Sequence, residues 1–512
     1  MAAGVAMMGR RGLAAAALML LLLGDAAALR AERAFVPYQP PSLPPNEAAA
    51  IAAHGFAPDD VGFLVHDLES GEVLAARNAG EAFIPASVTK VATAIAALEN
   101  LGGAHRFTTR VAAVGTAENG VLDGDLVLIG GGDPGLGADD LLALCHELRA
   151  SGIREISGRL LYDDGLYFRH PAIESRQPLD AGYNPGVSAL SLDFNRVQLR
   201  WQSNSGGGAL SGYSVPPLPG LALDVAAQHA GGDQLWQPEQ NGNGTLWRLS
   251  PRAPEGGASW LPVREPASAA AQIFQRICAQ AGVRLPAPEA GESADYAGAN
   301  AWNAARQDSQ PLSEVVRGML AYSNNLVAEL VGLAAARSLT QQAQSLPESA
   351  KELARWWRAR LPGTDWSEYV TLNHSGLSPD ARATPSQFVA MLSAVDGRFY
   401  GSEGQRRSLE SLLPAAGLHG SLSGRLANPA TGLKVWAKTG TVNYASGLAG
   451  YLHSEGGKRL AFALFVNDKA ARKAYDEDPE RRGARMRAEA AGWRGRAKAL
   501  EDVLVESWAR RW

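Results

Sequence analysis

The chain has 512 residues, of which 46% are hydrophobic and 20% are charged, and its formal net charge is −4. This length is too great for one ordinary core, so we expect two or three domains. The nearly neutral balance argues against nucleic acid as the main partner. The two cysteines exclude a disulfide-rich scaffold and a multi-cysteine metal site.

The N-terminus has the pattern of a secretory signal peptide. Two arginines precede an apolar run over residues 13–23, and three alanines at 26–28 offer a cleavage site. An uncleaved anchor is the alternative, but this run is too short to span a bilayer as a stable helix. We therefore expect residues 1–28 to be a signal peptide, and the mature chain to act in the periplasm or elsewhere outside the cytoplasm.

A proline-rich segment at residues 37–45 precedes the first predicted elements. Asn46 suits the N-cap of an alanine-rich helix that ends at Gly55. Residues 61–67 and 72–77 have the pattern of a β-hairpin. We expect folded structure to begin with these elements.

Pro85 opens a buried helix whose first turn carries Ser87 and, three residues later, Lys90. A serine hydroxyl needs a base within hydrogen-bond reach to become a good nucleophile, and a desolvated lysine can lose its proton and act as that base. The alternative is a capping serine followed by a surface lysine. Only eight residues of the chain are lysines, and only Lys90 follows a serine by three positions. Because arginine cannot act as a base, this rarity favours a functional pair.

From about residue 108 short alternating β runs and glycine-rich turns replace the helical pattern. We expect a mainly β insertion in two parts, one formed by residues 108–200 with 266–300 and a smaller one by 201–265. Cys145 and Cys278 each lie in an apparently amphipathic helix, which favours two buried thiols over a bridge, although an extracytoplasmic compartment would permit the bridge.

The helical pattern returns near residues 267–282 and again at 313–336. Within the second run, Ser323 and Asn325 supply a hydroxyl that can relay a proton and an amide that can hold a carbonyl. Taken alone, this Ser-x-Asn is ordinary helix-capping chemistry.

Residues 434–441, 446–452 and 459–466 predict three antiparallel strands. The first strand carries Lys-Thr-Gly-Thr at 438–441, which offers a fixed positive charge, hydroxyls for a carboxylate, and a glycine that lets a substrate backbone approach the strand edge.

We expect the C-terminal residues 481–512 to form a basic amphipathic helix. Residues 481–500 carry seven Arg or Lys against one Glu, and Leu500, Val503, Leu504 and Trp508 fall at helical spacing. A packed terminal helix is favoured, and loose attachment to an anionic membrane surface is the alternative.

Three motifs therefore occur in order: Ser-x-x-Lys at 87–90, Ser-x-Asn at 323–325 and Lys-Thr-Gly at 438–440. Together they resemble the set described for β-lactamases and penicillin-binding proteins. The 236 positions between Ser87 and Ser323 are too many for a compact β-lactamase. The chain resembles instead the class C low-molecular-mass penicillin-binding proteins, the D-alanyl-D-alanine carboxypeptidase/endopeptidase group also called the penicillin-binding protein 4 family.

In that family two extra domains are inserted at this place, which matches the composition change at 108–300. The resemblance implies an α/β (α+β) serine β-lactamase/transpeptidase-like domain, with an antiparallel sheet flanked by helices, that the insertion splits. That domain would consist of residues 29–107 and 301–480. The resemblance also extends to four shorter stretches: 85–90, 132–134, 375–378 and 413–422.

The implied mechanism is serine acyl transfer without a cofactor or metal. Ser87 would attack the carbonyl between two terminal D-alanines of a peptidoglycan peptide, with Lys90 as its base. Ser323 would relay a proton toward the leaving amine, while Asn325 would hold the substrate amide and position Lys90. The same serine would be acylated covalently by β-lactam antibiotics.

The strand motif has a supporting role in this mechanism. Lys438 would lend positive potential, Thr439 and Thr441 would bind the terminal carboxylate, and Gly440 would let the substrate lie close. The backbone N–H groups of Ser87 and Thr441 would form the oxyanion hole.

Two further pairs of residues match the family pattern less closely. Asp163 and Asp164 resemble an acidic position that contacts the amino end of a diaminopimelate side chain, although Asp-Asp-Gly is also ordinary turn chemistry. Asn373 and His374 depart from the acidic residue and glycine expected there.

The rival interpretations lack their signatures. A β-lactamase would need a Glu-x-x-Leu-Asn base, and Glu368 precedes Leu372-Asn373 by the wrong spacing. A catalytically silent wall-binding protein would be expected to have lost a motif residue. A zinc peptidase would need a cluster of His, Asp or Glu ligands. Four histidines lie in sequence contexts unrelated to one another and form no such cluster: His66, His146, His374 and His419.

Overall fold

The computed structural model describes residues 46–203, 210–215, 222–224, 236–241, 244–250, 253–298, 300–401, 404–478 and 483–512. All of them belong to one compact unit, Pro45–Trp512. The expected signal peptide and the proline-rich segment at 37–45 lie outside the described residues, as do the glycine-rich turn at 204–208 and part of the smaller inserted region.

A five-stranded antiparallel sheet forms the centre of the catalytic part of the chain, in the order β17-β18-β19-β1-β2. It joins the N-terminal hairpin to the C-terminal strands, which confirms both predicted groups. The strands are β17 (Val435–Val442), β18 (Ala445–His453), β19 (Arg459–Asn467), β1 (Val61–Asp67) and β2 (Val73–Arg77).

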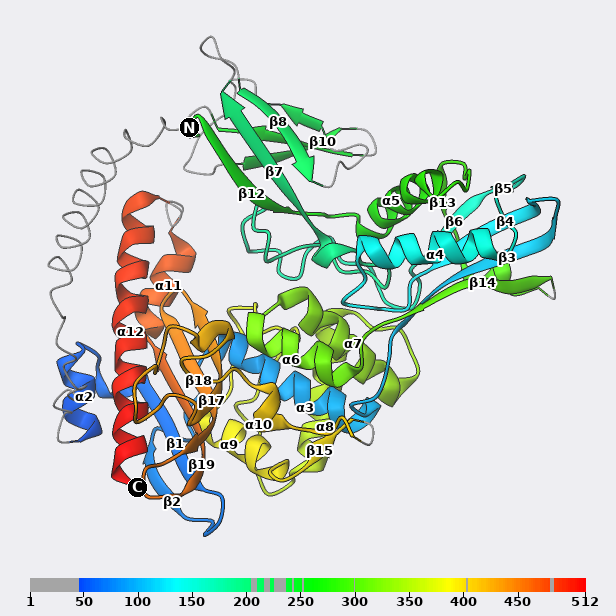
Figure 1. Cartoon of the computed structure of the whole chain (residues 1–512). Coiled ribbons are helices and arrows are strands. Elements are labelled where there is room, and N and C mark those ends of the chain that lie inside the picture. The colour runs from blue at the N-terminus through cyan, green and yellow to red at the C-terminus, as the bar shows by residue number, and fades with distance from the viewer. Residues whose placement is uncertain are drawn as a thin grey trace, which may run out of the picture. The chain divides into compact units, whose positions relative to one another are not determined.

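Helices cover both faces of this sheet because its strands are apolar on both sides. Ala461 and Phe465 of β19 belong to the core beneath the inner helices, while Leu460 and Leu464 belong to the core on the opposite face. The inner helices are α3 (Thr89–Leu101), α6 (Leu312–Tyr322), α7 (Asn325–Thr340), α8 (Leu346–Arg360) and α9 (Pro385–Ala394), and the outer ones are α2 (Glu47–Ala53) and α12 (Ala484–Arg511), as Figure 1 shows. The expected fold class is confirmed.

The short remaining elements of this part are β15 (Phe399–Tyr400), β16 (Arg407–Ser408), α10 (Leu409–Leu412) and α11 (Lys469–Glu477).

The larger inserted region is built on a second sheet, in the order β13-β6-β4-β3-β14, with β5 also paired to β4. The strands are β3 (Thr108–Glu118), β4 (Val121–Ile129), β5 (Glu155–Ile156), β6 (Leu160–Asp163), β13 (Pro288–Ala290) and β14 (Ala301–Asp308). Because β14 pairs with β3 along its length, this sheet extends to Asp308 and does not end at the expected boundary, residue 300. The strand by which the chain enters the inserted region, β3, and the strand by which it leaves, β14, are thus neighbours in one sheet.

The smaller inserted region contains two three-stranded sheets, β12-β7-β8 and β10-β11-β9. Trp201, Trp236 and Trp247 form the centre of its core. The strands are β7 (Arg196–Ser203), β8 (Leu210–Val215), β9 (Ala222–Asp224), β10 (Trp236–Asn241), β11 (Gly244–Leu249) and β12 (Gly256–Pro262).

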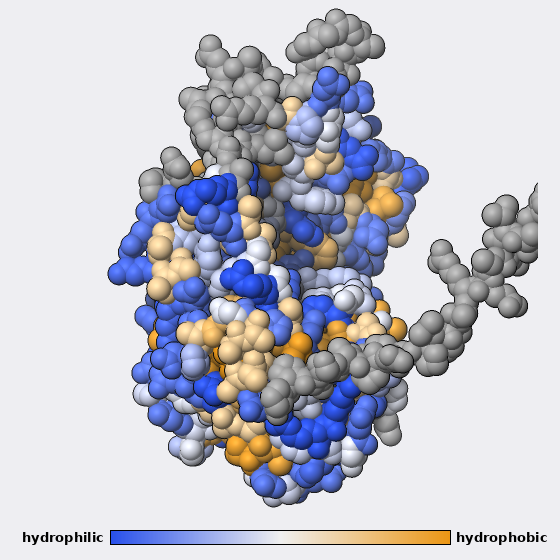
Figure 2. Space-filling model, turned by 90° about the vertical axis from the view of Figure 1, so that its left-hand side faces the viewer, coloured by the Kyte–Doolittle hydropathy of each residue, from blue (hydrophilic) through white to orange (hydrophobic). Residues whose placement is uncertain are grey.

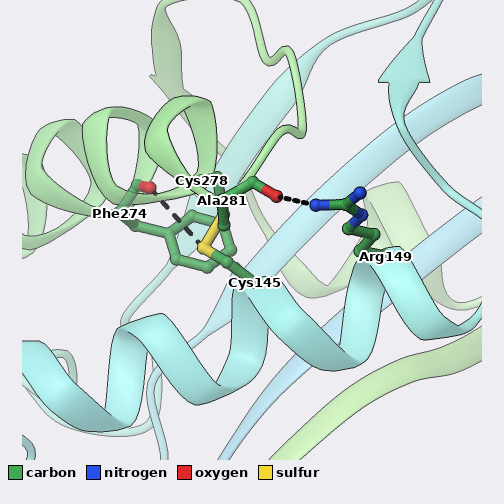
Figure 3. The surroundings of a disulfide bond; sticks show 5 residues. All are labelled: Cys145, Arg149, Phe274, Cys278 and Ala281. Carbon is green, nitrogen blue, oxygen red and sulfur yellow. Dashed lines mark hydrogen bonds between the residues drawn. A yellow bond between two sulfur atoms is a disulfide. The ribbon is translucent and has the colours of Figure 1, made fainter.

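Cys145 and Cys278 form a disulfide, so the expectation of two free buried thiols was wrong. They lie on α4 (Ala138–Ala150) and α5 (Pro266–Gln280), which run side by side over the second sheet (Figure 3). Their Cα atoms are 5.0 Å apart, and Arg149 of α4 donates to the Ala281 carbonyl at 3.0 Å. Both helices and their burial follow from the sequence pattern, but the pattern does not show that the two buried faces meet.

The C-terminal helix α12 packs on the outer face of the central sheet and against α2. Leu500, Leu504 and Trp508 are fully buried there, and Trp508 contacts the rings of Phe63 and Phe462. Figure 2, which views the molecule from the α12 side of Figure 1, shows hydrophilic side chains interspersed with small apolar patches. The predicted packed terminal helix is therefore confirmed. Among the described residues, no helix combines the length and apolarity needed to cross a membrane.

Candidate active site

The proposed nucleophile lies on a short 3-10 turn, Ala86–Val88, that leads directly into α3. Ala86 has φ +47°, in the left-handed region that non-glycine residues rarely adopt. Such strain often accompanies functional positions. Lys90 follows within the first turn of α3, and its Nζ donates to Ser87 Oγ at 2.9 Å.

Lys90 is fully buried and its amine has three acceptors. Besides Ser87 Oγ these are Asn325 Oδ1 and the Ser375 carbonyl, each at 2.8 Å. Burial lowers the pKa of Lys90 to about 7. A lysine with this pKa is neutral in a large fraction of molecules at neutral pH, so its lone pair can take the proton of Ser87.

Glu329, which the sequence did not indicate, interacts electrostatically with Lys90. It is fully buried on α7, and its two carboxylate oxygens accept the backbone N–H groups of His374 at 2.8 Å and Ser375 at 3.0 Å. Burial raises the pKa of Glu329, while its negative charge acts to raise the pKa of Lys90. The signal in the sequence was one acidic residue inside the apolar run 326–336.

A tight turn between α6 and α7 presents the second motif. Ser323 ends α6 with φ +57°, and Asn324 caps α7 by accepting the Val327 N–H at 3.2 Å. Asn325 then connects two parts of the molecule: its Oδ1 accepts from Lys90, while its Nδ2 donates to the Tyr183 carbonyl of the inserted region at 2.9 Å.

Lys438 connects the third motif to the second. Its Nζ donates to Ser323 Oγ at 2.9 Å and to the Thr439 carbonyl at 2.6 Å. The side chain is fully buried, and burial together with the charge of Lys90 holds its pKa well below the usual value. The structure thus brings these residues together as two hydrogen-bonded groups, Lys90 with Ser87 and Asn325, and Lys438 with Ser323.

Gly440 lets strand β17 lie directly against the nucleophile turn. A Cβ at this position would be 2.5 Å from the Pro85 carbonyl oxygen and 3.1 Å from Ser87 N, so only glycine fits. β17 is the edge strand of the sheet, and such an edge can pair with a substrate backbone. Residues 414–416 already pair with its first residues, 435–437. Thr441 lines the cavity beside Ser87, whereas the Thr439 hydroxyl donates to Ser421 Oγ at 2.8 Å.

The two groups open into a cavity of about 460 Å³. Ser87, Ser323, Asn325 and Thr441 line it, together with side chains from the inserted region and from α11 and α12: Arg176, Gln177, Pro178, Tyr183, Arg472, Tyr475, Asp476 and Arg494. The nucleophile is therefore open to a ligand while both lysines remain buried.

Asp163 and Asp164 do not line this cavity and have internal partners. Asp163 accepts from the Tyr296 hydroxyl and from the Gly165 N–H two residues later, which is the ordinary turn arrangement. Asp164 is fully buried, paired with Arg169 and bonded to Ser188 at 2.6 Å. A direct contact to substrate from either carboxylate is therefore not supported by their positions.

The loop that departs from the family pattern has a structural explanation. His374 is fully buried, and burial lowers its pKa to about 3, so the ring is neutral. Its Nε2 lies 2.8 Å from Ser349 Oγ, and the ring fills the space over Gly332, where a Cβ would overlap it. Asn373 Oδ1 accepts the N–H groups of the two residues after Ser375 at 3.0 and 3.1 Å.

Comparison with known proteins gives a consistent result. The model of the D-Ala-D-Ala carboxypeptidase 3 (S13) family matches residues 47–486. A D-alanyl-D-alanine carboxypeptidase of Actinomadura sp. is 30% identical over 79% of this chain and 77% of its own, and the D-alanyl-D-alanine carboxypeptidase DacB of Haemophilus influenzae is 26% identical over 80% and 85%. The crystal structure of Haemophilus influenzae penicillin binding protein 4 superposes with a TM-score of 0.72 at 22% identity, covering 90% of this chain and 99% of that one.

Proposed function

The chain belongs to the D-Ala-D-Ala carboxypeptidase 3 (S13) family, and from this membership we propose how its own residues remove the terminal D-alanine of peptidoglycan stem peptides. It is a serine carboxypeptidase, a hydrolase. The observation that supports the proposal best is the buried Lys90 amine, which is bonded at once to Ser87 Oγ and Asn325 Oδ1.

Acylation begins when the neutral amine of Lys90 takes the proton of Ser87. The hydroxyl oxygen attacks the carbonyl carbon of the penultimate D-alanine, and the bond from that carbon to the D-alanine nitrogen breaks. The leaving amine takes a proton from Ser323, whose hydroxyl is hydrogen-bonded to Lys438. The proton that Lys90 took from Ser87 then replaces the one that Ser323 gave up, so both lysines and Ser323 end the step as they began it. An ester on Ser87 and free D-alanine result.

Two features would stabilise negative charge in this step, one at the oxyanion and one at the terminal carboxylate of the substrate. The N–H groups of Ser87 and Thr441 would donate to the oxyanion, because close approach at Gly440 places the strand against the nucleophile turn. The Thr441 hydroxyl, beside the buried amine of Lys438, would hold the terminal carboxylate. Water then hydrolyses the ester and regenerates Ser87.

The same serine would be acylated by penicillin. In that reaction the amine produced by ring opening stays attached to the acyl group, so it remains in the cavity and hinders attack by water. We therefore expect slow release of the penicilloyl group.

We further propose an extracytoplasmic location, with residues 1–28 as a cleaved signal peptide. The buried Cys145–Cys278 disulfide supports this, since such bonds persist in oxidising compartments. Membrane attachment through α12 does not belong to the proposal, because its apolar residues are buried against the sheet.

Labelling with fluorescent penicillin tests the proposal. We expect the wild-type protein to be labelled and to release D-alanine from a pentapeptide, and Ser87→Ala to do neither. Ser70→Ala, in the exposed turn between β1 and β2, is the matched control and should behave as wild type. Labelling that survives Ser87→Ala would overturn the assignment.

A further inference from the structure

Two C-terminal helices contribute side chains to the catalytic cavity, the cavity of about 460 Å³ that Ser87 lines. Arg472 of α11 and Arg494 of α12 line it together with Ser87 and Thr441. Arg494 lies beyond residue 486, where the match to the family model ends. The acyl-transfer steps described above use neither arginine.

The turn between β17 and β18 connects Thr441 to these helices. The two strands pair up to Val442 and Ala445, so Asn443 and Tyr444 form the turn itself. Thr441 is only two positions before Asn443. A displacement of the turn would therefore move the end of β17, and with it the N–H and the hydroxyl of Thr441.

Tyr444 gives this turn a conformation that needs support. Its φ is +59°, in the left-handed region that bulky L-residues rarely adopt. Such a residue persists only where its surroundings hold it in place. The buried Tyr444 ring contacts those of Tyr475 on α11 and Trp493 on α12, at 5.8 and 5.7 Å between centroids. Both helices therefore pack on the turn.

Asn443 is bound by one arginine from each helix. Arg472 donates to its backbone carbonyl at 3.0 Å, and Arg494 donates to its side-chain Oδ1. Hydrogen bonds from charged donors are stronger than those from neutral ones. Because the backbone and the side chain of one residue are both held, the turn is fixed in direction as well as in place.

Helix α12 gives the Arg494 side chain a rigid base. The preceding residue, Trp493, is buried and lies edge-on to the Phe56 ring at 5.7 Å between centroids. Further along the same helix, Leu500 and Trp508 are fully buried against the central sheet. A side chain on a packed helix is held more precisely than one on a loop, so Arg494 is suited to position a neighbour.

We propose that Arg494 is a positioning residue for acyl transfer. By donating to Asn443 it holds the β17–β18 turn and thereby fixes Thr441, the residue whose N–H and hydroxyl act on the substrate. The inference rests on the proposed function, which gives Thr441 these two roles. The C-terminal helix is then a working part of the site and not only a cover for the outer face of the sheet.

Four variants test whether Arg494 acts through Asn443. Arg494→Met removes the donors but keeps a long side chain, and Asn443→Leu removes the acceptor at similar size. The double variant combines these two changes, and Asn443→Asp keeps the accepting oxygen. Arg496→Met is the matched control on the same helix, because the Arg496 guanidinium lies over the Phe56 ring, 5.9 Å from its centroid, and not against the turn.

The measurements are the second-order rate of penicillin acylation, kcat and KM for D-alanine release from a pentapeptide, and Tm as a check on folding. We expect Arg494→Met and Asn443→Leu each to slow acylation about tenfold. In both variants kcat should fall more than KM rises, because the oxyanion contact is made only in the transition state. The double variant should be within about twofold of Asn443→Leu alone, and Asn443→Asp should retain most of the rate. Arg496→Met should behave as wild type.

Four results would overturn this role. They are wild-type acylation by Arg494→Met, losses that multiply in the double variant, a loss confined to KM, and an equal loss in Arg496→Met. Multiplying losses or a loss confined to KM would mean that Arg494 contacts the substrate directly. A wild-type protein that releases no D-alanine and takes no penicillin instead contradicts the proposed function itself.

Discussion

Lys90 shows how single residues set the chemistry of this site. A lysine with its ordinary pKa would remain protonated and could not accept a proton. Burial lowers the pKa of Lys90, while the nearby Glu329 carboxylate acts in the opposite direction, and the result is about 7. The amine is therefore held near the point where it can both accept and return a proton at neutral pH.

The pH profile of acylation reports this balance. Acylation should increase as pH rises through about 7, because only neutral Lys90 can accept the serine proton. Glu329→Gln removes the charge that raises the pKa of Lys90, so the acid limb should move to lower pH. The measurement is the second-order rate of penicillin acylation from pH 5 to 9. Glu368→Gln, at an exposed position, is the control. A limb that stays in place or moves to higher pH in Glu329→Gln contradicts this account.

The contact between strand β17 and the nucleophile turn is the main feature at the scale of elements. Residues more than 300 positions apart meet there, because β17 lies at the edge of a sheet beneath the start of α3. Gly440 permits that close approach, which the proposed mechanism needs so that the N–H groups of Ser87 and Thr441 can act on one oxygen.

Gly440→Ala tests this contact. The added Cβ would be 2.5 Å from the Pro85 carbonyl oxygen, so the strand or the turn must move. We expect penicillin acylation to slow about 100-fold, since a displacement of about 1 Å at a reacting group can have that effect. Gly363→Ala, where a Cβ meets no atom within 4 Å, should acylate like wild type. Wild-type acylation by Gly440→Ala would mean that the close approach is not needed.

Much of this arrangement could be predicted because it is local or motif-based. The Ser-x-x-Lys spacing, the strand around Lys438 and the two helices carrying cysteines each follow from neighbouring residues. Glu329, Tyr183 and Arg494 could not be predicted, because their roles depend on which distant segments face them. The disulfide was missed for the same reason: helical periodicity indicates a buried face without saying what covers it.

At the scale of the whole molecule, the insertion does more than lengthen the chain. Tyr183 reaches back to accept a hydrogen bond from Asn325, and Arg176 forms an ion pair with Asp380 beside the 375–378 loop. The inserted region thereby contributes a wall to the catalytic cavity. Its own stability is consequently part of the stability of the site.

The disulfide provides a test at this scale. It links residues 133 positions apart, and closing a loop of that length in the unfolded chain is worth about 4–5 kcal/mol in the chain-entropy model. The Cys145→Ala/Cys278→Ala double variant should therefore unfold at a lower temperature than wild type. Reductant should lower the wild-type Tm but leave that of the variant unchanged. Equal Tm values for both proteins without reductant would contradict a stabilising role.

The central claim is that Ser87 carries the acyl group. Trypsin cleaves after Arg77 and Lys90 and so releases a peptide of residues 78–90 that contains Ser87. Mass spectrometry of the penicillin-treated protein should find the penicilloyl mass on Ser87 within this peptide. An adduct on any other residue, or a protein with no adduct, would contradict the account.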